Sequence, residues 1–335
     1  MLQRKYSKVR IISNVLICFV LITLSLLIIV NRQRVVDQIT VWQFHSTSEI
    51  NALVDRAGIN DNGKFYYLAS QPKLDATSDF NNECNRIENV TAILGCYSGS
   101  RIYIYDVTNK QLDGVREITA THETLHAVYV RLSTDEQSKV NTLLETEYKK
   151  LENNKDYTDR MAFYARTEPG ERDNELHSVI GTEIANISPA LETYYSKYFS
   201  DRQKVVALDI KYNSVFQKLE TRANELARQL NTLALSISND STQYNADAQV
   251  LNDDIVAFNN RAENGQFLSQ AQFTSERSVL SDRVVELDAM RTSINNDITN
   301  YNSILIEYNS IASESKKLYN SINSTLAPAP SVKVD

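Results

Sequence analysis

In the C-terminal part of the chain, apolar residues recur every three or four positions, with polar residues between them. This spacing places the apolar side chains on one helical face and predicts the a and d seam of a coiled coil. Two such runs flank the polar sequence Glu263-Asn264-Gly265. The first run is Leu208, Tyr212, Val215, Leu219, Ala223, Leu226, Leu230, Leu233, Ile237, Tyr244, Ala248, Leu251, Ile255, Phe258 and Ala262, and the second is Leu280, Val284, Leu287, Ile294, Ile298, Tyr301, Leu305, Tyr308, Ala312, Tyr319 and Ile322.

Two runs of similar length, joined by a turn that contains glycine, fold most simply into an antiparallel helical hairpin. We therefore predict such a hairpin over residues 205–325. At about 1.5 Å per residue, a run of about 55 residues makes an arm roughly 80 Å long. Residues 326–335 follow the second run and contain Pro328 and Pro330, so we predict a disordered tail there.

At the other end of the chain, residues 11–30 form an apolar run without a charged side chain. A helix of about 20 apolar residues spans a hydrocarbon core of about 30 Å, which predicts a transmembrane helix. No small-x-small cleavage site follows, and this favours an uncleaved signal anchor over residues 1–35. More basic residues precede the run than follow it, so we expect a single-pass plasma membrane protein with its C-terminal part extracytoplasmic. These basic residues are Arg4, Lys5, Lys8 and Arg10 before the run, and Arg32 and Arg34 after it.

Residues 36–204, between the anchor and the hairpin, have mixed patterns that predict an α+β domain in which helix predominates. Residues 46–57 predict a helix. Residues 64–69 and the alternating apolar run at 101–107 predict strands. We expect these strands to form a small sheet against which a later helix packs.

The rest of this domain predicts a series of helices. The first begins after Asp113, its predicted N-cap, and has apolar residues at helical spacing. Ser133 and Glu136 have the spacing of a capping box, which predicts a further helix as far as Leu151. Ser188, which precedes a proline, is the predicted cap of a later helix.

One segment of this helical part has side chains suited to metal chemistry, and it reads His122-Glu123-Thr124-Leu125-His126. In a helix, residues four apart lie on the same face, so both imidazoles can bind one metal ion. Glu123 lies next to the first histidine, where a general base can accept a proton from a metal-bound water. The alternative interpretation is a pair of hydrogen-bonded histidines on an amphipathic helix.

A catalytic zinc ion usually has three protein ligands and keeps a further position for water. No histidine follows closely after His126, so the third donor must lie further along the chain. Residues 173–183 predict a helix with three candidates, of which Glu175 is our first choice, Glu183 the second and His177 the third. His177 can instead donate a hydrogen bond to the developing oxyanion. The alternative is that all three are surface or capping residues.

The H-E-x-x-H motif, inside a helix that follows a strand, resembles that of the zincin metallopeptidases. The resemblance covers about residues 100–200. In addition, Asn174-Glu175-x-x-Ser178 is similar to the N-E-x-x-S-D segment of the gluzincin group, with Val179 in place of the aspartate. The exact family is not identified by these motifs.

The resemblance implies a small zincin-like catalytic domain with Zn²⁺ as its cofactor. His122, His126 and Glu175 would bind the zinc ion, and Glu123 would be the catalytic general base. By analogy with the family, the strand at residues 101–107 would border the cleft and hold an extended peptide by main-chain pairing.

The chain has three cysteines, and Cys18 lies inside the apolar N-terminal run. Cys84 and Cys96 are therefore the only pair in the part expected outside the membrane. An isolated pair in an extracytoplasmic domain usually forms a disulfide, and we predict this bond. The alternative is two unrelated buried thiols.

Charge and composition limit the partners. The net charge is −7, and outside the flank of the anchor there is no basic cluster, so we expect no nucleic-acid partner. The sequence predicts a membrane-anchored, extracytoplasmic zinc peptidase that acts on peptides or proteins, with a coiled coil for a protein partner or self-association. The alternative is an envelope-anchored scaffold or adaptor whose metal site is structural or inactive.

Overall fold

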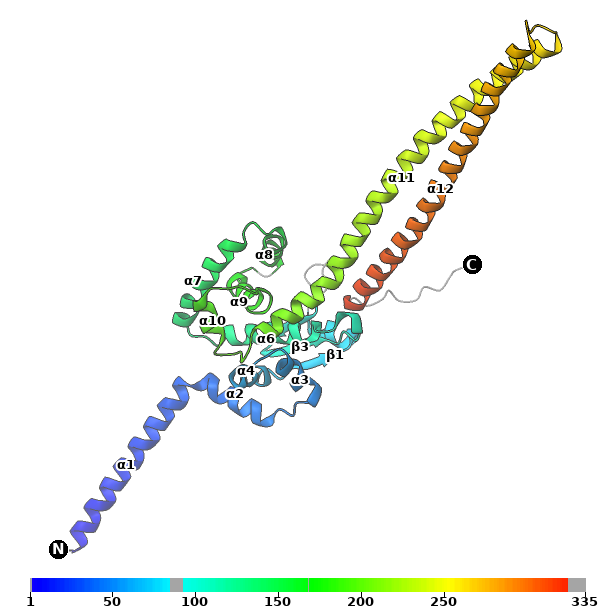
Figure 1. Cartoon of the computed structure of the whole chain (residues 1–335). Helices are drawn as coiled ribbons and strands as arrows, with labels where there is room; N and C mark the ends of the chain where they lie inside the picture. The colour runs from blue at the N-terminus through cyan, green and yellow to red at the C-terminus, as the bar shows by residue number, and fades with distance from the viewer. Residues whose placement is uncertain (1, 85–92, 168, 325–335) are drawn as a thin grey trace. The chain divides into compact units, whose positions relative to one another are not determined.

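The chain folds into two compact units that are mostly helical (Figure 1). A small sheet in the first unit completes an α+β, mainly α fold and confirms the predicted class. Met1–Ser214 and Leu318–Asp335 belong to the first unit, and Val215–Lys317 forms the second. The first unit therefore takes in both ends of the predicted hairpin. The computed structural model describes residues 2–84, 93–167 and 169–324, so the predicted tail at 326–335 lies outside the described residues.

The chain begins with α1 (Leu2–Val30) and α2 (Arg32–Gln43). Among the described residues no single helix has the length and hydropathy of a membrane span. Leu16–Val30 and α2 have them when taken together, but the two helices are bent by 82° relative to each other. The signal anchor therefore stays a prediction. α2 is tied to the rest of the first unit at Asp37, whose two carboxylate oxygens each accept a hydrogen bond from Arg131 at 3.0 Å.

Two short helices follow, α3 (Ser48–Arg56) and α4 (Asp61–Ala69). α3 confirms the helix predicted at its position. The strand predicted at residues 64–69 is wrong, because these residues belong to α4. Asn60 explains the difference, since its side-chain oxygen accepts a hydrogen bond from the Gly63 N–H at 3.0 Å and caps a helix there.

The sheet has three strands in the order β1-β3-β2, namely β1 (Lys73–Asp75), β3 (Arg101–Tyr105) and β2 (Gly95–Ser98). β3 is parallel to β1 and antiparallel to β2, and it confirms the strand predicted at 101–107. Its expected role in binding a peptide is wrong, however, because β3 is the central strand and is already hydrogen-bonded along both edges.

A disulfide fastens β2 to the preceding helix, α5 (Thr77–Glu83). Cys96 of β2 is bonded to Cys84, with a Cα–Cα distance of 5.9 Å, which confirms the predicted pair. The buried side chains of Phe80 and Tyr103 pack in the same small apolar cluster as Cys84.

α6 (Val115–Tyr129) is the central helix of the first unit and packs against the sheet, α3, α4 and α9. Most of its residues are buried. The capping box of Ser133 and Glu136 and the N-cap at Ser188 are both present, as predicted. The helices after α6 are α7 (Thr134–Leu151), α8 (Lys155–Thr167), α9 (Arg172–Glu183) and α10 (Pro189–Tyr195).

The start of α6 differs from the prediction. Its N-cap position is held by Gly114, which has a φ of 105°, and not by Asp113. Glycine reaches this left-handed conformation without a Cβ clash. The Asp113 carboxylate forms ion pairs with Arg56 and Lys211, each at 2.7 Å, and does not cap the helix.

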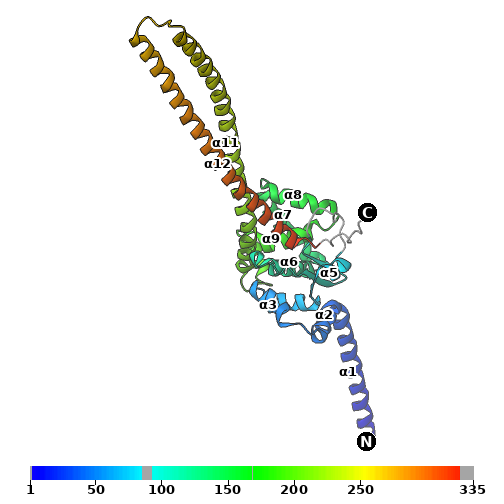
Figure 2. The same ribbon diagram turned by 90° about the vertical axis from the view of Figure 1, so that its right-hand side faces the viewer.

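α11 (Gln203–Glu263) and α12 (Gln270–Ile322) form a hairpin and run side by side (Figures 1 and 2). The second unit, Val215–Lys317, is this hairpin without the start of α11 and the end of α12. Arg283 pairs with Asp254 at 2.6 Å across it, and an Arg222–Glu307 pair lies closer to its base, as an antiparallel register requires. The two helices are compatible with the predicted coiled coil. Within Val215–Lys317 the buried apolar side chains are predicted seam positions: Leu226, Leu230, Leu251, Phe258 and Ile294.

Candidate metal centre

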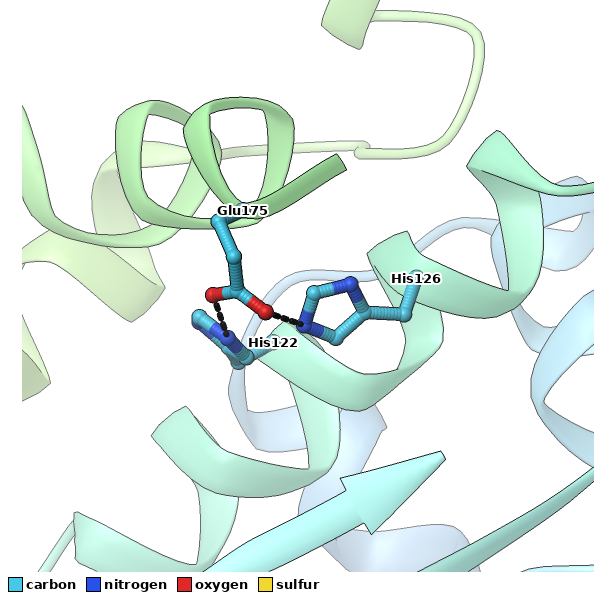
Figure 3. A group of neighbouring side chains, drawn as sticks. All are labelled: His122, His126 and Glu175. Atoms are coloured by element: carbon cyan, nitrogen blue, oxygen red, sulfur yellow. Dashed lines mark ion pairs between the residues drawn. The ribbon is translucent and has the colours of Figure 1, made fainter. Parts of the chain in front are cut away.

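Three side chains from two helices converge in the first unit, as Figure 3 shows. His122 and His126 come from adjacent turns of α6, and Glu175 reaches them from α9. The Nε2 atom of His126 lies 3.3 Å from Glu175 Oε1, and that of His122 lies 3.6 Å from Oε2. One donor atom from each residue fits within 4.8 Å of the others. Of the three donors considered in the sequence, the described structure groups Glu175 with the histidines.

A close crossing of α6 and α9 makes this convergence possible. Gly181 of α9 faces Leu125, the neighbour of His126 on α6. A Cβ atom on Gly181 would lie 2.4 Å from Leu125 Cδ1 and 2.9 Å from a ring atom of Tyr195. Glycine therefore lets the two helices approach closely enough for the Glu175 carboxylate to reach both imidazoles.

Asn174 controls which nitrogen of His126 faces the carboxylate. Its side-chain oxygen lies 2.9 Å from His126 Nδ1, and its amide nitrogen donates to Glu171 at 2.9 Å. The amide is thus oriented so that its oxygen accepts a hydrogen bond from Nδ1–H. This leaves the lone pair of Nε2 directed at Glu175, the orientation that a metal ligand needs.

Burial makes both imidazoles poor proton acceptors. Desolvation lowers the pKa of His122 to about 4, although the negative charge of Glu183 acts to raise it. It also lowers the pKa of His126, although Glu175 and Asn174 partly offset the effect. Both shifts favour the neutral imidazole, the form in which histidine binds metals.

Glu123 lies beside the three converging side chains without being one of them. It is buried and lines the same cavity as His122 and His126. The backbone of β2 approaches it closely, since a Cβ atom on Gly95 would lie 2.8 Å from Glu123 Oε1 and 2.5 Å from Thr119 Cγ2. Gly95 thus leaves the Glu123 carboxylate room beside the three converging side chains.

A cavity of about 680 Å³ opens at the three side chains. β2 and α6 line it together with α8, α9 and the first turns of α11. Among the described strands β2 pairs with β3 alone, so its other edge carries no partner strand. The Tyr105 N–H donates to the Leu94 carbonyl at 2.8 Å, so Leu94 and Tyr105 form a hydrogen-bonded pair. In an antiparallel ladder such pairs alternate with pairs that are not hydrogen-bonded. The N–H and C=O groups of Gly95 and Tyr97 therefore point away from β3.

Two sequence candidates lie apart from the convergence. His177 is fully buried, does not line the cavity, and has its Nε2 2.8 Å from the Tyr194 hydroxyl. It therefore does not face a substrate, and the role predicted for it as an oxyanion donor does not fit its position. Glu183 lines the cavity but forms an ion pair with Arg160 of α8 and is not grouped with the two histidines.

Arg160, Tyr164 and Asp209 are among the side chains that line the cavity and that sequence reasoning missed. Burial raises the pKa of the Tyr164 hydroxyl well above its usual value, and Glu175 and Glu183 add to the effect. Burial also raises the pKa of Asp209 to about 7, with Glu183 as the next cause. No local pattern marks these residues, because each looks like an ordinary polar position on a helix.

Comparison of the chain with models of known protein families, with curated protein sequences and with solved structures found no match.

Proposed function

We propose that this chain is a zinc-dependent peptidase in which His122, His126 and Glu175 bind the metal ion. The observation that carries the proposal is the convergence of these side chains within 4.8 Å, with Glu123 beside them in a cavity. Two imidazoles and one carboxylate form a common donor set for catalytic zinc. The neutral imidazoles and the fixed orientation of His126 fit the same purpose.

In this proposal each residue of the site has its own task. A bound zinc ion supplies Lewis acidity, which lowers the pKa of a coordinated water and polarises the scissile carbonyl. Glu123 accepts the proton of the attacking water and then passes it to the leaving amine. Tyr164 lines the cavity, and burial together with the negative charges of Glu175 and Glu123 raises the pKa of its hydroxyl. The hydroxyl therefore keeps its proton and can donate a hydrogen bond to the developing oxyanion, the role predicted for His177.

The substrate strand in this proposal pairs with β2. The outward main-chain groups of Gly95 and Tyr97 offer hydrogen-bond partners to an extended peptide, as in other cases of β-strand addition. β2 also lines the cavity beside Glu123, so a peptide bound there would pass the general base.

We further propose that the N-terminal helix anchors the protein in the plasma membrane, with the chain from about residue 36 onward outside. The uncharged run of residues 11–30 and the exposed apolar side chains within Leu16–Val30 support an anchor. The Cys84–Cys96 disulfide supports an oxidising compartment.

Metal analysis and hydrolysis of the full-length protein in detergent test the peptidase proposal. We expect about one zinc ion per chain and cleavage within a pool of diverse peptides. Glu123→Gln should keep the zinc and lose at least about 100-fold in kcat/KM, because proton transfer is removed. His126→Ala should lose the zinc.

Glu286→Gln is the matched control, because it makes the same change at an exposed position of α12 and should behave like the parent. A parent protein that binds no zinc, or a Glu123→Gln variant that cleaves as fast as the parent, would refute the proposal.

A second candidate function, an envelope scaffold, is favoured by the hairpin alone. Val215–Lys317 forms a compact unit by itself, as a docking arm would. In that case the biological effect would depend on the arm and not on Glu123.

A further inference from the structure

Near His122 the cavity is lined by charged side chains that are not among the proposed zinc ligands. Glu183 and Arg160 are the charged groups that act on His122. The same two groups act on Asp209. All four residues line one cavity, so Asp209 lies near the candidate metal centre on the side of His122.

Asp209 is buried in the cavity wall without a cation of its own. It comes from the first turns of α11 and is only 8% exposed. Its Oδ1 atom accepts a hydrogen bond from the Asn213 amide at 3.0 Å. Among the described residues no basic side chain forms an ion pair with it, and the nearby Arg160 is paired with Glu183.

The surroundings of Asp209 therefore disfavour its charge. Arg160 and Glu183 largely neutralise each other, and Tyr212 is a further, half-buried neighbour. Burial, followed by the charge of Glu183, raises the pKa of the Asp209 carboxyl to about 7. A buried carboxylate is stable when a cation accompanies it, and here the cavity leaves room for one to enter.

We propose that Asp209 forms a subsite which binds a cationic group of the peptide substrate, beside His122. The subsite rests on the proposed peptidase function, because the cavity is then the substrate cleft. The cation is an ammonium or guanidinium group, and it comes either from a lysine or arginine side chain or from the N-terminus of the peptide. Arg160 remains with Glu183 and leaves Asp209 to the substrate.

Hydrolysis of matched peptides tests the subsite. Quenched fluorescent peptides carry lysine, norleucine or glutamate at each position around the scissile bond, with either a free or an acetylated N-terminus. At pH 8 we expect the cationic peptide to exceed its neutral counterpart at least tenfold in kcat/KM. A preference for lysine identifies a side-chain cation, and a loss on acetylation identifies the N-terminal amine.

Asp209→Asn keeps the shape of the side chain and removes its charge, so the preference should fall to less than twofold. Asp253→Asn is the control, since it makes the same change at an exposed position of α11 and should keep the preference. Equal cleavage of cationic and neutral peptides by the parent overturns the inference. An unchanged preference in folded Asp209→Asn protein does so as well.

A binding measurement separates this inference from the peptidase proposal. Fluorescence anisotropy with a labelled lysine peptide and zinc-loaded Glu123→Gln protein, with and without Asp209→Asn, reports the affinity without hydrolysis. If the parent cleaves no peptide, the peptidase proposal fails, and a tenfold weaker affinity in Asp209→Asn still supports the cation subsite. An affinity that does not depend on Asp209 overturns it.

Discussion

Burial of the Asp209 carboxyl makes the stability of the first unit depend on pH. The pKa of this group rises from its usual value of 3.8 to about 7 in the folded protein. The folded protein therefore binds this proton more tightly than the unfolded chain does. By linkage, the contribution of Asp209 to stability falls as the pH rises from about 4 through 7. The groups around Asp209 are Glu183, Arg160, Tyr212 and Asn213.

Asp209→Asn removes this dependence, because an amide is not ionised. In metal-free protein we expect the Tm of the variant to exceed that of the parent by several degrees at pH 8, and the difference to shrink at pH 5. Thermal unfolding followed by circular dichroism at both pH values measures it. Asp253→Asn should match the parent at each pH. A Tm difference that is the same at pH 5 and pH 8 would contradict the burial of Asp209.

At the scale of elements, β2 is held in place by contacts from three directions. The disulfide fastens Cys96, and β3 pairs along one edge. The Tyr97 hydroxyl accepts a hydrogen bond from Arg131 at 3.0 Å, and Arg131 is itself held by Asp37 of α2. The helix that follows the predicted anchor thus supports the strand that lines the cavity.

Gly95→Ala tests how close β2 lies to Glu123. The new methyl group would meet Glu123 and Thr119 at distances well below contact, so one of these groups must move. We expect kcat/KM to fall at least about tenfold and the free energy of unfolding to fall by roughly 1–3 kcal/mol, while zinc binding is kept. Peptide hydrolysis, urea unfolding and metal analysis measure the three quantities.

Ser281→Ala, at an exposed position of α12 away from the cavity, is the control and should behave like the parent. If Gly95→Ala were as active and as stable as Ser281→Ala, the close approach of β2 to α6 would be wrong.

At the scale of the whole molecule, both ends of the hairpin belong to the first unit. Val205 and Val206 at the start of α11 are part of its core. At the end of α12, Asn109 donates to Ser321 at 3.2 Å, and Ser324 donates to the Ile93 carbonyl at 3.1 Å. A cut at residue 206 would therefore remove part of the core and the cavity wall along with the arm.

Replacement of residues 218–314 by a short flexible loop removes the arm and keeps these contacts. We expect zinc content and peptide hydrolysis within about threefold of the parent, because the cavity lies wholly in the first unit. Deletion of residues 206–335 should abolish both. Loss of zinc in the loop variant would contradict the independence of the two units. In cells, a loss-of-function phenotype that the loop variant shows and Glu123→Gln does not would favour the scaffold function.

Features that depend on neighbours along the chain could be read from the sequence. The spacing of His122 and His126 and the capping box at Ser133 were predicted correctly, because helical geometry relates residues three or four apart. The Cys84–Cys96 bond followed from the small number of cysteines. The hairpin followed from its long apolar repeat, which local periodicity defines.

Features that depend on contacts between distant segments appeared only in the tertiary structure. A Cβ atom on Gly63 would lie 2.5 Å from the Tyr198 carbonyl oxygen, a contact that no pattern within α4 reveals. The central place of β3, the burial of His177 and the position of Asp209 in the cavity wall are of the same kind. The sequence by itself thus determined the long helices of the hairpin, the helix of the H-E-x-x-H motif and the spacing of its histidines, because these arise within a few turns of chain. Only the fold decided which carboxylate meets them and which strand and charges line the cavity, because packing alone brings α9, β2 and α11 to α6.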